Sequence, residues 1–143
     1  MLKQLGICSI VYVLTFFLQV CAHIYIIHDV QQKERMHQDF GIKYFHNIFI
    51  LLQIMLIILF IHFVNILVWA VAYYSVGALA NFDVAIYFSM VNYTTLGYGD
   101  ITLGSAWNLL GPIEALSGII MAGWSISLYF AVYTHLVRRR IMQ

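Results

Sequence analysis

Seven consecutive residues, Thr94 to Asp100, form the part of this chain whose residue types could do chemistry. They read Thr-Thr-Leu-Gly-Tyr-Gly-Asp, so two glycines alternate with larger side chains. Glycine adopts positive φ angles without steric cost, so Gly97 and Gly99 allow alternate backbone carbonyls to turn toward one side. A row of carbonyl oxygens can replace the water shell of a cation, and Thr95 adds a hydroxyl oxygen. The segment therefore indicates a cation site built mainly from backbone.

Long apolar stretches flank this segment and must position it. Three stretches are long enough to cross a bilayer, which takes about 20 apolar residues: roughly 5–27, 48–74 and 111–137. The chain of 143 residues is 63% hydrophobic and only 9% charged, with a mean hydropathy of +0.88, which excludes an ordinary soluble domain. We expect an all-α membrane protein with three transmembrane helices, at about 5–27, 44–74 and 111–137, and a polar loop at 28–43.

The segment between the second and third stretches is too short to span the membrane. After a turn at 75–80, Asn81 is placed to cap a short helix from Phe82 to about Thr94, with Asp83 in its first turn. We interpret this segment as a re-entrant pore helix, followed by the extended stretch 95–99. The C-terminal end of such a helix carries partial negative charge, which favours a cation. A turn at 100–110 then leads to Pro112, expected as the first residue of the third helix.

The motif resembles the selectivity filter of potassium channels, which usually reads TVGYGD with small variations. From about Phe45 to Leu136 the order of helix, pore helix, filter and helix resembles their two-helix pore module. The run Tyr87-Phe88-Ser89 matches its pore helix, and Trp107 follows the filter at a common spacing. More narrowly, the chain resembles a group of small prokaryotic ion-channel proteins. It departs from some bacterial members at Val91, where they carry a Glu that pairs with the filter Asp.

The resemblance implies a homotetramer, because one filter loop cannot surround an ion and four copies are needed. It implies that potassium passes along the carbonyls of five ion-binding residues, Thr95, Leu96, Gly97, Tyr98 and Gly99. Asp100 is expected to stand at the outer mouth. The side chains of Leu96 and Tyr98 are expected to face away from the ion. The third helix is expected to line the inner cavity and the second to face lipid.

Charge and family likeness together predict the organisation and orientation. We divide the chain into an N-terminal helix with its loop (1–43), a pore domain (44–137) and a short basic tail (138–143). The filter of the family lies near the outer face, which places the N-terminus outside and the C-terminus in the cytoplasm of a cell (inner) membrane. The positive-inside rule agrees, since one basic residue, Lys3, would lie outside and six inside: Lys33, Arg35, Lys43, Arg138, Arg139 and Arg140.

Several polar or small residues in the apolar stretches have more than one interpretation. Glu114 either stabilises the start of the third helix, supports the filter from behind, or takes part in conduction. His62 and Asn65 share a helix face and either bond to each other or to a neighbouring helix, or His62 senses protons. Gly118 and Gly123 are either a gating hinge or sites of close helix packing. Cys8 and Cys21 are expected to be free thiols.

These observations favour a passive potassium-selective channel. Its expected partners are further copies of the same chain, membrane lipids and potassium ions. No cofactor and no nucleic-acid partner is expected, and no nucleophile–base pair or phosphate-binding loop indicates an enzyme. Two alternatives remain open: a non-selective monovalent cation channel, and a non-conducting regulatory subunit of another membrane protein. A transporter would need internal repeats or paired broken helices, and the chain has one broken segment.

Overall fold

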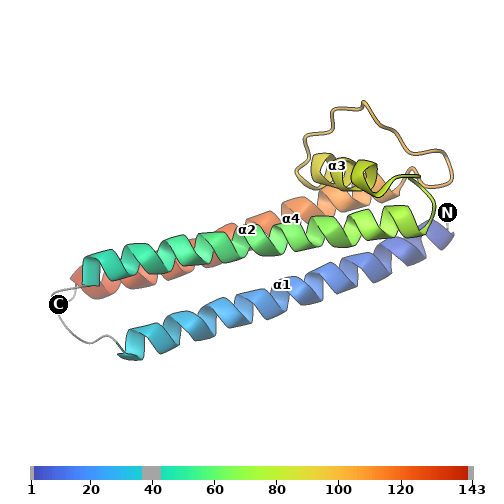
Figure 1. The fold of residues 1–143 in the computed structure, drawn as a ribbon. Coiled ribbons are helices and arrows are strands. Elements are labelled where there is room, and N and C mark those ends of the chain that lie inside the picture. Colours follow the sequence, from blue (N-terminus) through green and yellow to red (C-terminus); the bar gives the residue numbers. More distant parts are fainter. Residues whose placement is uncertain (1, 37–42, 142–143) are drawn as a thin grey trace.

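Four helices make up the fold in the computed structural model, which describes residues 2–36 and 43–141 (Figure 1). They are α1 (Leu2–Met36), α2 (Lys43–Ser75), α3 (Phe82–Tyr93) and α4 (Leu110–Ile141). The three long helices lie alongside one another, and α3 with the loop after it covers one end of α2 and α4. Segments Leu2–Lys33, Asn47–Ser75 and Leu110–Val137 are each long and apolar enough to cross a membrane. The predicted class, an all-α membrane protein with three spans, is therefore confirmed.

The first helix is longer than predicted, and the prediction that it ends at Ile27 is wrong. It continues to Met36, so that most of the expected loop from His28 to Lys43 belongs to α1. Residues 28–36 contain neither Gly nor Pro and are rich in helix-forming Gln, Lys, Glu and Arg. Within this extension Lys33 Nζ lies 2.6 Å from Asp29 Oδ2, an i,i+4 ion pair that supports the helix.

Two clusters of buried side chains hold the bundle together, one at each end. The cluster at the filter end joins all four helices, with Trp69, Tyr73, Ala85, Leu110 and Met121 completely buried. The cluster at the far end joins the long helices through Ile26, Val30, Ile50, Ile54, Val132 and Leu136. Thus one half of the bundle supports the pore helix, while the other packs long helices alone.

The extra helix α1 is tied to the pore module by polar contacts at three levels. At the filter end the Gln4 amide donates to the carbonyls of Ser105 and Ala106, in the loop before α4. Midway along the helix, Gln19 bonds to Ser125 of α4. Near the far end Lys33 donates to Gln53 of α2. These contacts make α1 an integral part of the bundle rather than a loosely attached anchor.

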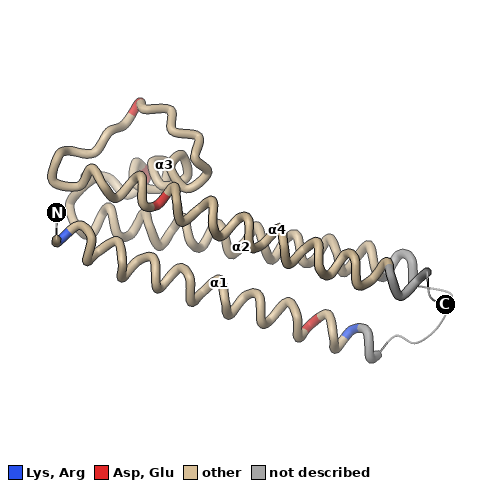
Figure 2. The backbone as a smooth tube through the Cα atoms, turned by 180° about the vertical axis from the view of Figure 1, so that it is seen from behind, with Lys and Arg blue, Asp and Glu red and all other residues tan. Residues whose placement is uncertain are grey.

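The two chain ends lie at opposite ends of the bundle. The N-terminal end lies beside the filter loop, and the C-terminal end lies at the far end (Figures 1 and 2). Lys3 and Lys33, the two described basic side chains, mark these two ends of α1 (Figure 2). The side chains of the other five basic residues counted in the charge argument lie outside those that the structure describes.

Candidate functional site: the pore helix and the filter segment

The short helix α3 has the predicted position and nearly the predicted length. It runs from Phe82 to Tyr93, and Asn81 precedes it with extended backbone (φ −117°, ψ 135°). The Asn81 side chain makes no capping hydrogen bond, whereas Asp83 does lie in the first turn. Twelve residues rise only about 18 Å, well short of the roughly 30 Å hydrocarbon core, so α3 is re-entrant.

The end of α3 determines how the filter begins. The Thr95 amide donates to the Asn92 carbonyl (2.8 Å) and the Leu96 amide to the Val91 carbonyl (3.0 Å). This pair of bonds is the Schellman motif, whose penultimate residue takes a left-handed conformation. That residue is Thr95, with φ 61°. Left-handed backbone is unusual for a β-branched side chain, and the residue pattern did not predict it.

Left-handed residues alternate along the filter segment. Thr95, Gly97 and Gly99 have φ values of 61°, 55° and 74°, so every second residue from 95 to 99 is left-handed. The prediction that Gly97 and Gly99 use positive φ is thereby confirmed. The same alternation could have identified Thr95 from the sequence, because it lies two residues before the first glycine. Such a backbone turns successive peptide groups in a regular way, as a row of carbonyl ligands requires.

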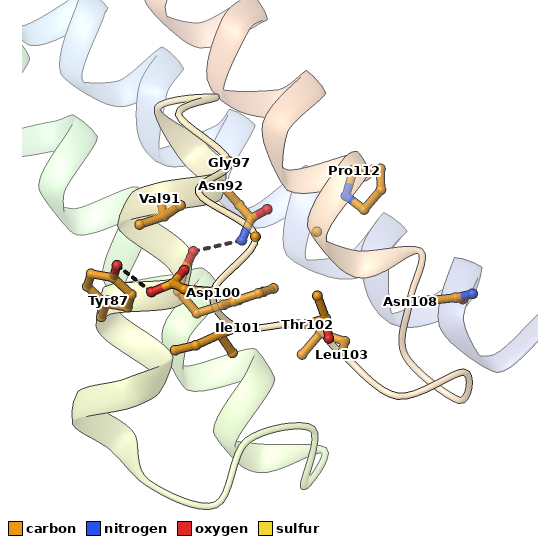
Figure 3. A pocket seen from close by; sticks show the side chains of 13 residues that line it. Tyr87, Val91, Asn92, Gly97, Asp100, Ile101, Thr102, Leu103, Asn108 and Pro112 are labelled. Atoms are coloured by element: carbon orange, nitrogen blue, oxygen red, sulfur yellow. Dashed lines mark hydrogen bonds between the residues drawn. The ribbon is translucent and has the colours of Figure 1, made fainter.

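The filter segment is uncovered in the single chain. All residues from 94 to 100 are exposed, including the large side chains of Leu96 (55%) and Tyr98 (66%). A pocket of about 320 Å³ lies beside the segment, between α3, residues 97–103 and the start of α4 (Figure 3). Exposed apolar groups next to an open pocket are typical of a surface that another chain covers.

Asp100 is hydrogen-bonded to the pore helix. Tyr87 Oη donates to Asp100 Oδ2 at 2.7 Å (Figure 3). Tyr87 lies one helical turn before Val91, the position where some bacterial members carry a Glu that pairs with the filter Asp. In this chain Tyr87 bonds to that carboxylate instead. This hydrogen bond to Asp100 raises the pKa of the Tyr87 phenol above its ordinary value.

Glu114 joins three helices behind the filter. The helix α4 begins at Leu110, so Pro112 is its third residue and the prediction of Pro112 as the first is wrong. Glu114 is therefore beyond the first turn, and the helix-start interpretation loses its basis. Its carboxyl group is completely buried and accepts hydrogen bonds from Tyr73 of α2 (2.5 Å) and Ser89 of α3. This geometry is that of a support for the pore helix, and no local pattern identifies Tyr73 and Ser89 as the two partners.

His62 and Asn65 do not bond to each other; they reach neighbouring helices. His62 contacts Tyr93 Oη of α3 (2.9 Å) and Ser125 Oγ of α4 (3.1 Å). Asn65 donates to Gln19 of α1 (3.0 Å) and to Tyr93 Oη (3.3 Å). His62 and Asn65 therefore bond to neighbouring helices, which is one of the predicted alternatives.

The two glycines of α4 have different surroundings. A Cβ atom added to Gly118 would lie 2.0 Å from the carbonyl oxygen of Tyr93, the last residue of α3. A Cβ atom added to Gly123 would meet nothing within 4 Å. Close helix packing therefore accounts for Gly118, while the hinge interpretation of Gly118 and Gly123 stays a prediction. Cys8 and Cys21 are both free, Cys8 buried and Cys21 exposed, as expected.

These features define a class of membrane protein: three long apolar helices, with a short helix at one end of the bundle that is followed by an exposed loop with alternating left-handed residues. The family model described as "Ion channel" matches residues 61–135, which is 75 of the 143 residues. The chain therefore belongs to this family, which has the two-helix pore module of potassium channels and is a channel family rather than an enzyme family. The match covers half of α2, α3, the filter and α4, and α1 precedes it. No curated protein and no solved structure matches the chain.

Proposed function

We propose that this ion channel is a homotetramer selective for potassium, which passes through four copies of the filter segment. The observation that carries the proposal is the alternation of left-handed residues at Thr95, Gly97 and Gly99. It supports a column of carbonyls from Thr95, Leu96, Gly97 and Tyr98, with the Thr95 hydroxyl at the inner end. Gly99 completes the turn toward Asp100, whose carboxylate concentrates cations at the mouth.

The need for four chains follows from the geometry of one. A single loop offers oxygens on one side of an ion, whereas a dehydrated cation needs oxygens around it. Fourfold cyclic symmetry supplies these oxygens and lets neighbouring copies cover Leu96 and Tyr98, which one chain leaves exposed. In this arrangement α4 lines the inner cavity and α2 faces lipid.

The orientation belongs to the same proposal. The N-terminal end and the filter lie at one end of the bundle, so a filter at the outer face places the N-terminus outside. The basic residues near the other end then lie in the cytoplasm, as the positive-inside rule favours. Reporter fusions at the two termini, one active only inside and one only outside, test this. A C-terminal fusion active outside would contradict it.

The channel function is tested by ion flux through the purified protein in liposomes. Potassium flux that barium blocks, with little sodium flux, is the expected result. Gly97→Ala should abolish it, because alanine is strained at φ 55°. Gly104→Ala is the matched control, since Gly104 lies in the outer loop without positive φ or close neighbours. Equal sodium flux would favour a non-selective channel. Absence of both flux and tetramer would favour a regulatory subunit.

A further inference from the structure

A chain of buried polar side chains runs across the middle of the bundle, separate from the filter and from the Glu114 contacts. It begins at Gln19 and His23 of α1, passes through Ser125 of α4 and His62 of α2, and ends at Tyr93. Gln19 and Ser125 are almost completely buried, His23 and Tyr93 are 4% and 5% exposed, and His62 is partly buried. Buried polar groups within an apolar bundle need partners, so the positions of their protons can be worked out.

The Ser125 hydroxyl is the branching point of this chain. Gln19 Nε2 donates to it at 2.7 Å, and the Nε2 atoms of His23 and His62 lie 3.3 Å and 3.1 Å away. A hydroxyl has one proton and two lone pairs, so one imidazole donates to it and the other accepts from it. The Gln19 amide also contacts His23 Nε2 at 3.0 Å, which makes this nitrogen an acceptor. His62 Nε2 therefore carries a proton and donates to Ser125.

This assignment fixes the other side of His62. A neutral imidazole protonated at Nε2 accepts at Nδ1, and Tyr93 Oη lies 2.9 Å from that atom. The Tyr93 hydroxyl therefore donates to His62, while it accepts from Asn65 Nδ2. With both histidines neutral, each hydrogen bond from Gln19 through Ser125 and His62 to Tyr93 has a donor and an acceptor, while the Nδ1 proton of His23 lies off this path and has no partner.

A proton added to His62 breaks one bond of this set. Nδ1 becomes a donor, so the Tyr93 hydroxyl loses its acceptor and is left as an unsatisfied buried donor. His23 is the less favourable place for the proton, because Gln19 and Ser125 share the single lone pair of its Nε2 and its buried Nδ1 has no partner. The two imidazoles share one hydroxyl, so only one of them can carry a charge without strong repulsion.

The groups that face His62 come from all four helices, and none of them offsets a positive charge. They are Gln19 and His23 of α1, Asn65 of α2, Tyr93 of α3 and Ser125 of α4. Within residues 2–33 and 47–137, no acidic or basic side chain hydrogen-bonds to either imidazole. The nearest buried carboxyl group, that of Glu114, is bonded to Tyr73 and Ser89 instead.

The far end of this chain lies directly before the filter segment. Tyr93 is the last residue of α3, its carbonyl packs against Gly118, and Thr95 follows two residues later. We propose that His62 is a positioning residue for the pore helix, and that its protonation releases Tyr93, so that ion flux falls at acid pH. This inference rests on the proposed channel function, which it supplements with a regulatory signal.

The first test measures potassium flux in liposomes at pH 8 and pH 5, with the same pH on both sides. Wild type should lose about tenfold in flux, as expected when one buried donor is left unsatisfied. His62→Gln provides a neutral donor and acceptor, so it should conduct at both pH values. His28→Gln is the matched control, since His28 is an exposed histidine of α1, and it should respond to pH like wild type. A His62→Gln variant that keeps the full acid response would overturn the proposal.

The second test does not depend on conduction. Amide hydrogen exchange of residues 82–97, corrected for the intrinsic effect of pH, should become faster in wild type at pH 5 than at pH 8. Neither His62→Gln nor Tyr93→Phe should show this acid-induced change, because each removes one partner of the bond. Exchange in wild type that does not depend on pH would overturn the proposal. Protein that shows the exchange change but no flux at any pH would support the His62–Tyr93 connection and reject the channel function.

Discussion

The two ends of the bundle are built on different principles. At the filter end, hydrogen bonds and a close glycine contact place α3: Glu114 bonds to Tyr73 and Ser89, and Gly118 packs against the Tyr93 carbonyl. At the far end, every buried member of the cluster is an aliphatic side chain, such as Ile26, Ile54 or Val132. Hydrogen bonds fix distance and direction, whereas aliphatic contacts tolerate small shifts. The end that carries the filter segment is thus the end with the stricter contacts.

Gly118→Ala should break this arrangement most severely. The new Cβ atom would lie 2.0 Å from the Tyr93 carbonyl oxygen, so the backbone of α3 or α4 must move. We expect a loss of about 3 kcal/mol or more in the free energy of unfolding, together with loss of potassium flux. Thermal unfolding in detergent and liposome flux measure the two effects.

Gly123→Ala is the control for that prediction, because nothing lies within 4 Å of the added atom. Its unfolding temperature should stay equal or rise slightly, as alanine favours a helix over glycine. Altered gating in Gly123→Ala at unchanged stability would support the hinge prediction for this residue. Equal destabilisation of the two variants would contradict the packing role of Gly118.

Glu114→Ala should rank second. It leaves the hydroxyls of Tyr73 and Ser89 without their shared acceptor and creates a cavity, at a cost of about 2–5 kcal/mol. Glu114→Gln keeps the volume and one acceptor oxygen and should lose clearly less. Denaturant unfolding of the two variants gives the comparison; similar losses would mean that the carboxyl group does not support the pore helix.

Ile54→Val examines the far end. Ile54 is 1% exposed, and removal of one buried methylene group should lower stability by about 1 kcal/mol. The ratio of potassium to sodium flux should stay as in wild type, because aliphatic contacts at this end do not position the filter. A shifted ratio would mean that the two ends are not independent.

Tyr87→Phe should have the smallest effect. The bond from Tyr87 to Asp100 is exposed, so we expect flux to change by less than about fivefold. The raised pKa of the phenol gives the pH dependence: the bond is present below the ordinary pKa of about 10 and is lost as pH rises through the higher folded value. Wild-type flux should change at alkaline pH, and Tyr87→Phe should not show this change.

Sequence reasoning succeeded where a local pattern determines the structure. The apolar lengths predicted the three spans, and the glycines at 97 and 99 predicted the positive φ angles. It failed at the end of α1, because a polar helix and a polar loop have similar compositions. It could not pair Glu114 with Tyr73 and Ser89, since these contacts join residues 41 and 25 positions apart and depend on how helices pack.

The hydrogen bonds to the Val91 carbonyl bear on which side chains can stand at position 96. It accepts hydrogen bonds from the amides of both Leu96 (3.0 Å) and Gly97 (3.2 Å). The end of α3 therefore determines the backbone path at residues 96 and 97. These bonds do not involve the Leu96 side chain, which is more than half exposed in the single chain. The backbone path therefore does not depend on which aliphatic side chain stands at position 96. In the proposed tetramer, a substitution at position 96 would have to preserve the fit to the neighbouring chain.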